Sequence, residues 1–125
     1  MKKILIIDDE KDFCFFVSQN LELTGKYKVV VTNSSKDGLS AALRHKPDVI
    51  LLDILMPGMN GFEVLAQLKG NQDTTTIPVI MLTAIDTEES KEKAVGLYNE
   101  DYITKPVDIA SLNAKIDSVL SRSRG

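Results

Sequence analysis

Two kinds of apolar segment alternate along the chain. Short runs of consecutive apolar residues are typical of strands buried on both faces of a parallel sheet, and segments with helical spacing lie between them. The predicted strands span residues 3–7, 28–32, 48–53, 78–83 and 101–104. This alternation indicates a sheet whose strands are joined by crossover helices that cover both faces.

The segments with helical spacing predict five helices. Four are expected at about residues 12–23, 61–69, 87–97 and 108–122, and the fifth lies between Ser34 and Pro47. Ser34 followed three residues later by Asp37 has the pattern of a capping box. The helix at 87–97 has the thinnest apolar stripe, so we expect it to be the least firmly anchored and suited to a moving part.

The first helix carries three phenylalanines in four positions. Helical spacing places Phe13, Phe16 and Val17 on the core stripe, so Cys14 and Phe15 are expected to point away from the core. A partly exposed aromatic on a small domain is often a contact for a partner. Packing of Phe15 on a neighbouring helix is the alternative.

Five strand-helix units in 125 residues favour one open, doubly wound α/β domain. A closed barrel of eight such units would need roughly 250 residues. We predict a flavodoxin-like five-stranded parallel sheet of order 2-1-3-4-5 in a single domain over residues 1–125, whose last few residues form a frayed tail or the start of a linker. The ligand site of such a sheet lies at the carboxyl ends of strands 1 and 3.

Composition and charge exclude several classes of function. Fifteen Lys and Arg against eighteen Asp and Glu give a net charge of −3 with no basic face, so direct nucleic-acid binding is not expected. The longest apolar runs, 4–7 and 49–52, are far shorter than the roughly 18 residues that cross a bilayer, so we expect a soluble, cytoplasmic protein without membrane contact. Cys14 is the only cysteine, which excludes an internal disulfide and a zinc site built on several thiolates.

Polar residues follow four of the predicted strands. Asp8 and Asp9 follow the first, Asp53 ends the third, Thr83 ends the fourth and Lys105 follows the fifth. Parallel strands bring these residues to one edge of the sheet, where the carboxylates would repel one another. A hard dication relieves that repulsion, and an acidic site without His or Cys matches the preference of Mg²⁺.

Together these motifs resemble the receiver domain of response regulators in two-component signalling. The residues that carry the resemblance are Asp8-Asp9, the run 51–61, Thr83-Ala84 and the run 101–106, in the order and spacing of that family. The match covers essentially the whole chain, and the combination is far more specific than any single motif. Tyr98-Asn99 is a departure, because the family often has Gly-Ala there.

The resemblance implies roles for the site residues. Asp53 would accept a phosphoryl group from a phosphohistidine of a sensor histidine kinase or histidine phosphotransfer protein. Asp9, Asp53 and the backbone carbonyl of Leu55 would bind Mg²⁺ directly, with Asp8 binding directly or through water, and Lys105 would pair with the phosphoryl oxygens. A carboxylate ionised at neutral pH needs no general base. The acyl phosphate would then hydrolyse, so the resemblance implies a switch and not a turnover enzyme.

The resemblance also implies how the signal leaves the site. The phosphoryl group would draw in the Thr83 hydroxyl and let Tyr102 turn inward, shifting the population between two packings of the face formed by the fourth helix, fifth strand and fifth helix. Phe15 lies on the helix where histidine kinases dock in this family. A monomer or a weak, phosphorylation-dependent homodimer is expected.

Three alternatives are weighed against this interpretation. In the first alternative, the chain is a receiver fragment of a longer regulator or hybrid kinase. An aspartate-nucleophile phosphohydrolase of the haloacid dehalogenase type would need a second acid two residues after Asp53, and that position is Leu55. A flavodoxin-like electron carrier is disfavoured because the acidic run 8–10 would repel a flavin phosphate.

Overall fold

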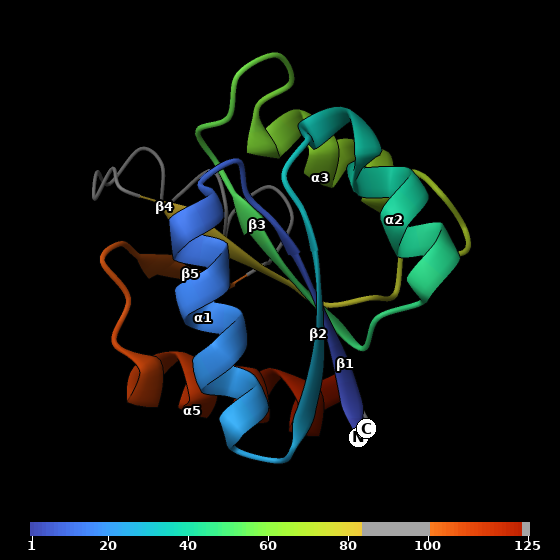
Figure 1. Cartoon of the computed structure of the whole chain (residues 1–125). Coiled ribbons are helices and arrows are strands. Elements are labelled where there is room, and N and C mark those ends of the chain that lie inside the picture. The colour runs from blue at the N-terminus through green and yellow to red at the C-terminus, as the bar shows by residue number, and fades with distance from the viewer. Residues whose placement is uncertain (84–100, 124–125) are drawn as a thin grey trace.

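The computed structural model describes residues 1–83 and 101–123 and contains five parallel strands in the order β2-β1-β3-β4-β5 (Figure 1). The strands are β1 (Lys2–Ile7), β2 (Tyr27–Thr32), β3 (Val49–Asp53), β4 (Val79–Thr83) and β5 (Asp101–Thr104). The helices are α1 (Lys11–Leu23), the short 3₁₀ helix η1 (Ser35–Asp37), α2 (Gly38–His45), α3 (Gly61–Lys69) and α5 (Ile109–Ser123). The predicted fold class and strand order are confirmed.

Helices cover both faces of the sheet because successive strand residues point in opposite directions. In β1, Ile4 and Ile6 pack with α1 and α5, whereas Leu5 and Ile7 pack with α2 and α3. Figure 1 shows these two pairs of helices on opposite sides of the strands. All residues of β3 and β4 are buried, so these central strands fix the frame from which the loops at the carboxyl edge project.

The core face of α1 differs from the predicted one. Cys14, Val17 and Leu21 are the buried residues of this helix, whereas Phe16 is 50% exposed. Cys14 therefore points inward and Phe16 outward, contrary to prediction, while Phe15 is exposed as expected. The predicted and the observed core-facing stripes differ by a small rotation of the helix. Apolar spacing alone favoured Phe16 over the smaller Cys14 for the core.

The chain before α2 also differs in detail from the prediction. A 3₁₀ turn comes first, and neither Ser34 nor Asp37 forms a side-chain capping hydrogen bond, so the predicted capping box is absent. At the other end of the chain, α5 continues to Ser123, through the first residues of the expected tail. The predicted helix at 87–97, and Tyr98-Asn99 after it, lie outside the described residues. In the described part of the chain, no helix combines the length and apolar character needed to cross a membrane.

Candidate functional site

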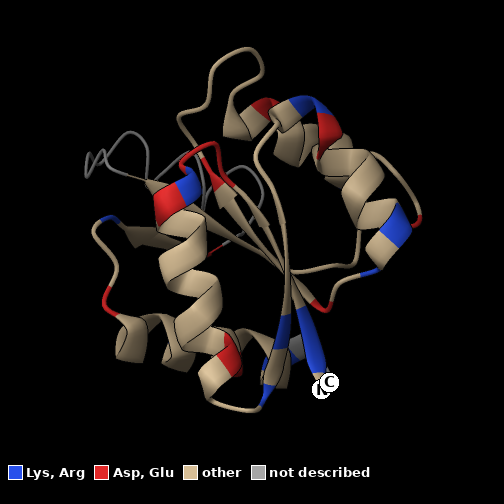
Figure 2. Cartoon of the chain, in the orientation of Figure 1, with Lys and Arg blue, Asp and Glu red and all other residues tan. Residues whose placement is uncertain are grey.

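Charged side chains are distributed unevenly between the two edges of the sheet. Figure 2 shows acidic residues in the loop between β1 and α1, and basic residues at the opposite ends of β1 and β2. Asp8 directly follows β1, Asp53 ends β3 and Lys105 directly follows β5. Asp8 and Asp53 are 0% and 3% exposed, which is rare for carboxylates that lack a partner. The strand ends thus hold two buried acids at one edge.

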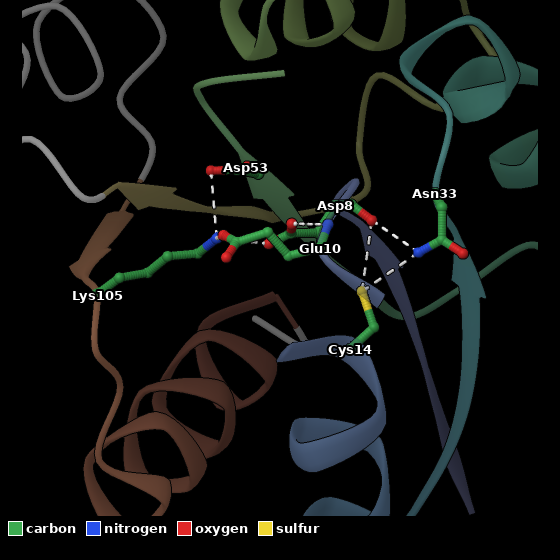
Figure 3. Close-up of polar contacts among 6 residues, drawn as sticks. All are labelled: Asp8, Glu10, Cys14, Asn33, Asp53 and Lys105. Carbon is green, nitrogen blue, oxygen red and sulfur yellow. Dashed lines mark hydrogen bonds and ion pairs between the residues drawn. The ribbon is translucent and has the colours of Figure 1, made fainter. Parts of the chain in front are cut away.

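Lys105 is the cation shared by these acids (Figure 3). Its Nζ lies 2.5 Å from Glu10 Oε1, 2.8 Å from Asp8 Oδ2 and 3.6 Å from Asp53 Oδ1. The same ammonium lies 4.3 Å from the centre of the Phe13 ring, within range of a cation–π contact. The Lys105–Pro106 peptide is cis, and the Lys105 amide donates to the Thr83 carbonyl oxygen at 2.7 Å. These contacts fix Lys105 from both its backbone and its side chain.

Burial and crowding change the acidity of the site. Burial, followed by the negative charge of Asp8, raises the pKa of Asp53 to about 7, although Lys105 opposes the shift. Burial also raises the pKa of Asp8. Burial alone would lower the pKa of Lys105, but hydrogen bonds to Asp8 and Glu10 outweigh it and the pKa is raised. The expectation that Asp53 is fully ionised at neutral pH therefore does not hold for the metal-free chain.

The main chain of Asp8 is held by two residues that the sequence analysis did not select. Asn33, after β2, donates from Nδ2 to the Asp8 carbonyl oxygen at 2.9 Å, and the Cys14 thiol donates to the same oxygen at 3.4 Å (Figure 3). Burial raises the pKa of Cys14 to about 12, so the thiol stays protonated as a donor. The end of β2, which was not predicted to contribute to the site, thus supports the acidic loop.

The loop after Asp53 returns closely to the end of β3. The Gly61 amide donates to the Ile54 carbonyl oxygen at 2.8 Å, and Asn60 Oδ1 caps α3 by accepting from the Glu63 amide at 3.0 Å. Buried Ser35 Oγ accepts from the Met59 amide at 3.3 Å. The segment between β3 and α3 is therefore closed by a hydrogen bond between its two ends and anchored to Ser35 through Met59.

The acidic cluster fits a divalent metal ion. Asp8, Glu10 and Asp53 each offer a carboxylate oxygen, and these oxygens lie within 4.8 Å of one another. When all three carboxylates are ionised, they and the Lys105 ammonium carry a local charge of −2, which a dication would neutralise. Hard oxygen donors without His or Cys are the ligands that Mg²⁺ prefers. Cys14, the cysteine beside the site, donates a hydrogen bond to the Asp8 carbonyl oxygen and is not part of this donor set.

A family model for the response regulator receiver domain matches residues 4–117. The chain belongs to this family. Receiver domains are the signalling switches of two-component systems, and they are generally not turnover enzymes. They are phosphorylated by histidine kinases and bind Mg²⁺ at an acidic pocket, and in this chain Asp8, Glu10 and Asp53 form an acidic group that could hold a metal ion.

Individual relatives agree with the assignment to the receiver family. Protein PilH of Pseudomonas aeruginosa is 40% identical over 97% of this chain and 99% of its own length. The alkaline phosphatase synthesis transcriptional regulatory protein PhoP of Bacillus subtilis is 38% identical over 98% of this chain. This chain spans about half the length of PhoP and of several other curated relatives.

Solved receiver structures share the whole fold. A two-component response regulator from Clostridium difficile superposes with a TM-score of 0.90 at 27% identity over 100% of both chains. The chemotaxis protein CheY4 of Vibrio cholerae gives a TM-score of 0.87 at 27% identity over 95% of this chain and 98% of its own. The described helices and strands therefore have the arrangement of known receiver domains.

The structure brings some of the predicted site residues into contact and places others nearby. Asp8, Asp53 and Lys105 form one cluster, and Glu10 joins it although it was not selected. The run of three acidic residues at 8–10 was the sequence feature from which a role for Glu10 could have been predicted.

The other predicted residues line the surroundings of this cluster. Asp9 is partly exposed and lines a hollow of about 300 Å³ with Asn33 and Pro57. Thr83 is buried at the end of β4, and Tyr102 is partly buried against the core beneath α2 and α3. Leu55 is 51% exposed, and its backbone forms a hydrogen bond to the Asp53 carboxylate.

Proposed function

We propose that this chain is a phosphorylation-activated switch in which Asp53 is the phosphoacceptor. The observation that carries the proposal is the position of Asp53, a buried carboxylate at the end of β3 with the Lys105 ammonium 3.6 Å away and Asp8 beside it. A nucleophilic oxygen and a cation for the incoming anion are thus held at one edge of a rigid sheet. Such chemistry depends mostly on positioning and charge stabilisation.

The transfer forms one bond and breaks another. An Asp53 carboxylate oxygen attacks the phosphorus of a phosphohistidine, the P–N bond breaks, and the imidazole of the partner leaves. Lys105 pairs with the phosphoryl oxygens as their charge builds up. Water later hydrolyses the acyl phosphate to phosphate and the free carboxylate, which resets the switch.

Asp8, Asp9, Asp53 and the backbone carbonyl of Leu55 would hold Mg²⁺, and Glu10 would add negative charge beside them. When bound, the ion offsets the negative charge of the acids and of the phosphoryl group. Ionised Asp53 is required for attack, and burial and Asp8 disfavour that charge in the metal-free chain even with Lys105 nearby, so its pKa is raised to about 7.

The output would follow from Thr83 and Tyr102. Both lie on the neighbouring strands β4 and β5, where Met81 pairs with Tyr102 and Thr83 pairs with Thr104. Attraction of the Thr83 hydroxyl to the phosphoryl group would change the packing of Tyr102 and of the face that includes β5 and α5. Phe15, 64% exposed on α1, would contact the phosphohistidine-bearing partner. The same switch would serve a receiver that acts alone or one that is part of a longer regulator or hybrid kinase.

Intact mass spectrometry after incubation with acetyl phosphate and Mg²⁺ tests the proposal. We expect a gain of one phosphoryl group, about 80 Da, that requires the metal and is lost in Asp53→Ala. A gain that persists in Asp53→Ala would place the phosphoacceptor elsewhere. A turnover phosphohydrolase would instead release phosphate continuously from an excess of donor, without accumulating the phosphorylated chain.

A further inference from the structure

Glu10 differs from the other two acids that contact Lys105. Its Oε1 is the nearest carboxylate oxygen to the ammonium, at 2.5 Å, yet its side chain is 59% exposed. The side chains of Asp8 and Asp53 are 0% and 5% exposed. The acid that holds Lys105 most closely is therefore the one that water solvates most readily.

Residues at the start of α1 contact the Lys105 ammonium, and Glu10 lies closer to it than Asp53 does. The Glu10 amide donates to Asp8 Oδ1 at 2.9 Å, which fixes the backbone of Glu10 beside the site. Phe13, one turn further along, presents its ring to the same ammonium at 4.3 Å. Lys105 Nζ remains 3.6 Å from Asp53, beyond hydrogen-bond distance. Figure 3 shows Glu10 beside the end of the Lys105 side chain.

We propose that Glu10 is a positioning residue that holds Lys105 in the unphosphorylated state and competes with the phosphoryl group for this ammonium. This inference rests on the proposed function of Asp53. A phosphoryl group on Asp53 needs Lys105 to turn from Glu10 toward the new oxygens. Glu10 can release the ammonium because its carboxylate is then solvated by water, whereas Asp8 has no such freedom.

The charges define the direction of the effect. Glu10 adds one negative charge at the place where a dianionic donor must approach, and it occupies the cation that this donor needs. Replacing Glu10 by glutamine keeps the size of the side chain and removes both effects. Ion pairs with an exposed partner contribute little, so we expect phosphorylation to become about two- to fivefold faster, not orders of magnitude faster.

Glu10→Gln and Asp12→Asn form a matched pair for the test. Asp12 lies in the same first turn of α1, is exposed, and forms no ion pair in the part of the chain that the structure describes. Each variant loses one negative charge, but only Glu10→Gln frees Lys105. The rate of phosphorylation by acetyl phosphate is measured at saturating Mg²⁺ by intact mass, together with Mg²⁺ affinity by titration calorimetry.

We expect a two- to fivefold higher rate in Glu10→Gln, a smaller increase in Asp12→Asn, and a Mg²⁺ affinity within about twofold of the parent chain. Damage to the fold would lower the rate, so an increase is not a structural artefact. Equal rates in the two variants, or a slower Glu10→Gln, would overturn the proposal. A tenfold loss of Mg²⁺ affinity would also overturn it, because Glu10 would then be a metal ligand.

A second measurement separates this inference from the proposed function. Lys105 is acylated with an amine-reactive reagent in the metal-free protein, and its rate of modification is followed by peptide mass spectrometry. Glu10→Gln is expected to make Lys105 react two- to fivefold faster, and Asp12→Asn is not. If the parent chain takes up no phosphoryl group but this difference is present, the phosphoacceptor proposal fails while Glu10 still holds Lys105. An unchanged Lys105 rate in Glu10→Gln overturns the role of Glu10.

Discussion

Gly61 is packed against the main chain of Asp53. A β-carbon at Gly61 would lie 2.3 Å from the Asp53 carbonyl oxygen and 2.7 Å from the Ile54 α-carbon, distances at which the backbone itself has to move. The first residue of α3 and the last residue of β3 therefore meet without room for any side chain. This contact sets the direction in which the chain leaves Asp53.

Gly61→Ala is expected to reduce both stability and phosphorylation. Displacing the backbone should lower the free energy of unfolding by about 1–3 kcal/mol, and it should slow uptake of phosphate from acetyl phosphate because Asp53 shifts. Urea unfolding and intact mass measure the two effects. Gly70→Ala is the control, since Gly70 ends the same helix with ordinary dihedral angles and is remote from Asp53. Equal losses in both variants would argue against a special role for Gly61.

The pH dependence of stability follows from the raised pKa of Asp53. In the unfolded chain this carboxyl titrates near 3.8, and in the metal-free fold near 7. Between these values the folded protein binds more protons than the unfolded one, so stability falls as pH rises from about 4 to 7. Asp53→Asn has no carboxyl group to titrate at this position, so it lacks this loss of stability. Its melting temperature should exceed that of the parent chain by little at pH 4 and by clearly more at pH 8, in buffer with a chelator. A difference that is independent of pH would contradict the burial argument.

Magnesium should stabilise the folded chain. An ion that binds only the native state adds about 1.4 kcal/mol for each tenfold increase in its concentration above the dissociation constant. The melting temperature is therefore expected to rise with added Mg²⁺, and Asp8→Asn should abolish most of the rise. Asp37→Asn, an exposed change in η1, should leave it intact. A rise of equal size in Asp8→Asn would place the metal elsewhere.

Thr83 is predicted to couple phosphorylation to β5. Thr83→Ala should still take up a phosphoryl group on Asp53, but the NMR shifts of Tyr102 should change much less on phosphorylation than in the parent chain. The reason is that the buried hydroxyl at the end of β4 is the group that a phosphoryl oxygen would attract. Full-sized Tyr102 shifts in Thr83→Ala would show that the signal takes another route.

Phe15 is predicted to act in transfer from a protein donor and not in transfer from a small one. The purified histidine kinase that phosphorylates the parent chain fastest should phosphorylate Phe15→Ala several-fold more slowly than the parent chain, because exposed aromatics are common anchors of interfaces. Acetyl phosphate should react with this variant at the parent rate. Leu23→Ala removes an 83% exposed apolar residue from the far end of the same helix and serves as control. An unchanged kinase rate in Phe15→Ala would remove this residue from the docking surface.

The sequence allowed the strands and the approximate position of the site to be predicted for a physical reason. Strands buried on both faces have uninterrupted apolar runs, so the expected bounds of β1 and β3 differ from the observed ones by one residue. Residues that end such strands must meet at one edge, so the predicted strand order brought Asp53 next to Asp8, while the role of Lys105 came from the resemblance to receiver domains.

The parts that the sequence did not predict depend on small rotations and on side-chain reach. A rotation of α1 exchanged Cys14 and Phe16 between core and surface, and both arrangements satisfy helical spacing. The contact of Glu10 with Lys105 depends on how the chain turns after Asp8, and the Asn33 hydrogen bond depends on a strand end that carries no charge. Neither the turn after Asp8 nor the end of β2 at Asn33 produces a periodic pattern in the sequence.

The ion pair between Lys105 and Glu10 joins positions 95 residues apart. All carboxylates of the cluster belong to the first 53 residues, but their counter-charge arrives only when the last strand pairs with β4. Closing a loop of this length has an entropic cost, and contacts between distant residues slow folding. A chain still emerging from the ribosome, or one cleaved before β5, carries Asp8 and Asp53 without Lys105. The charge balance of the site therefore depends on the addition of the last strand to the sheet.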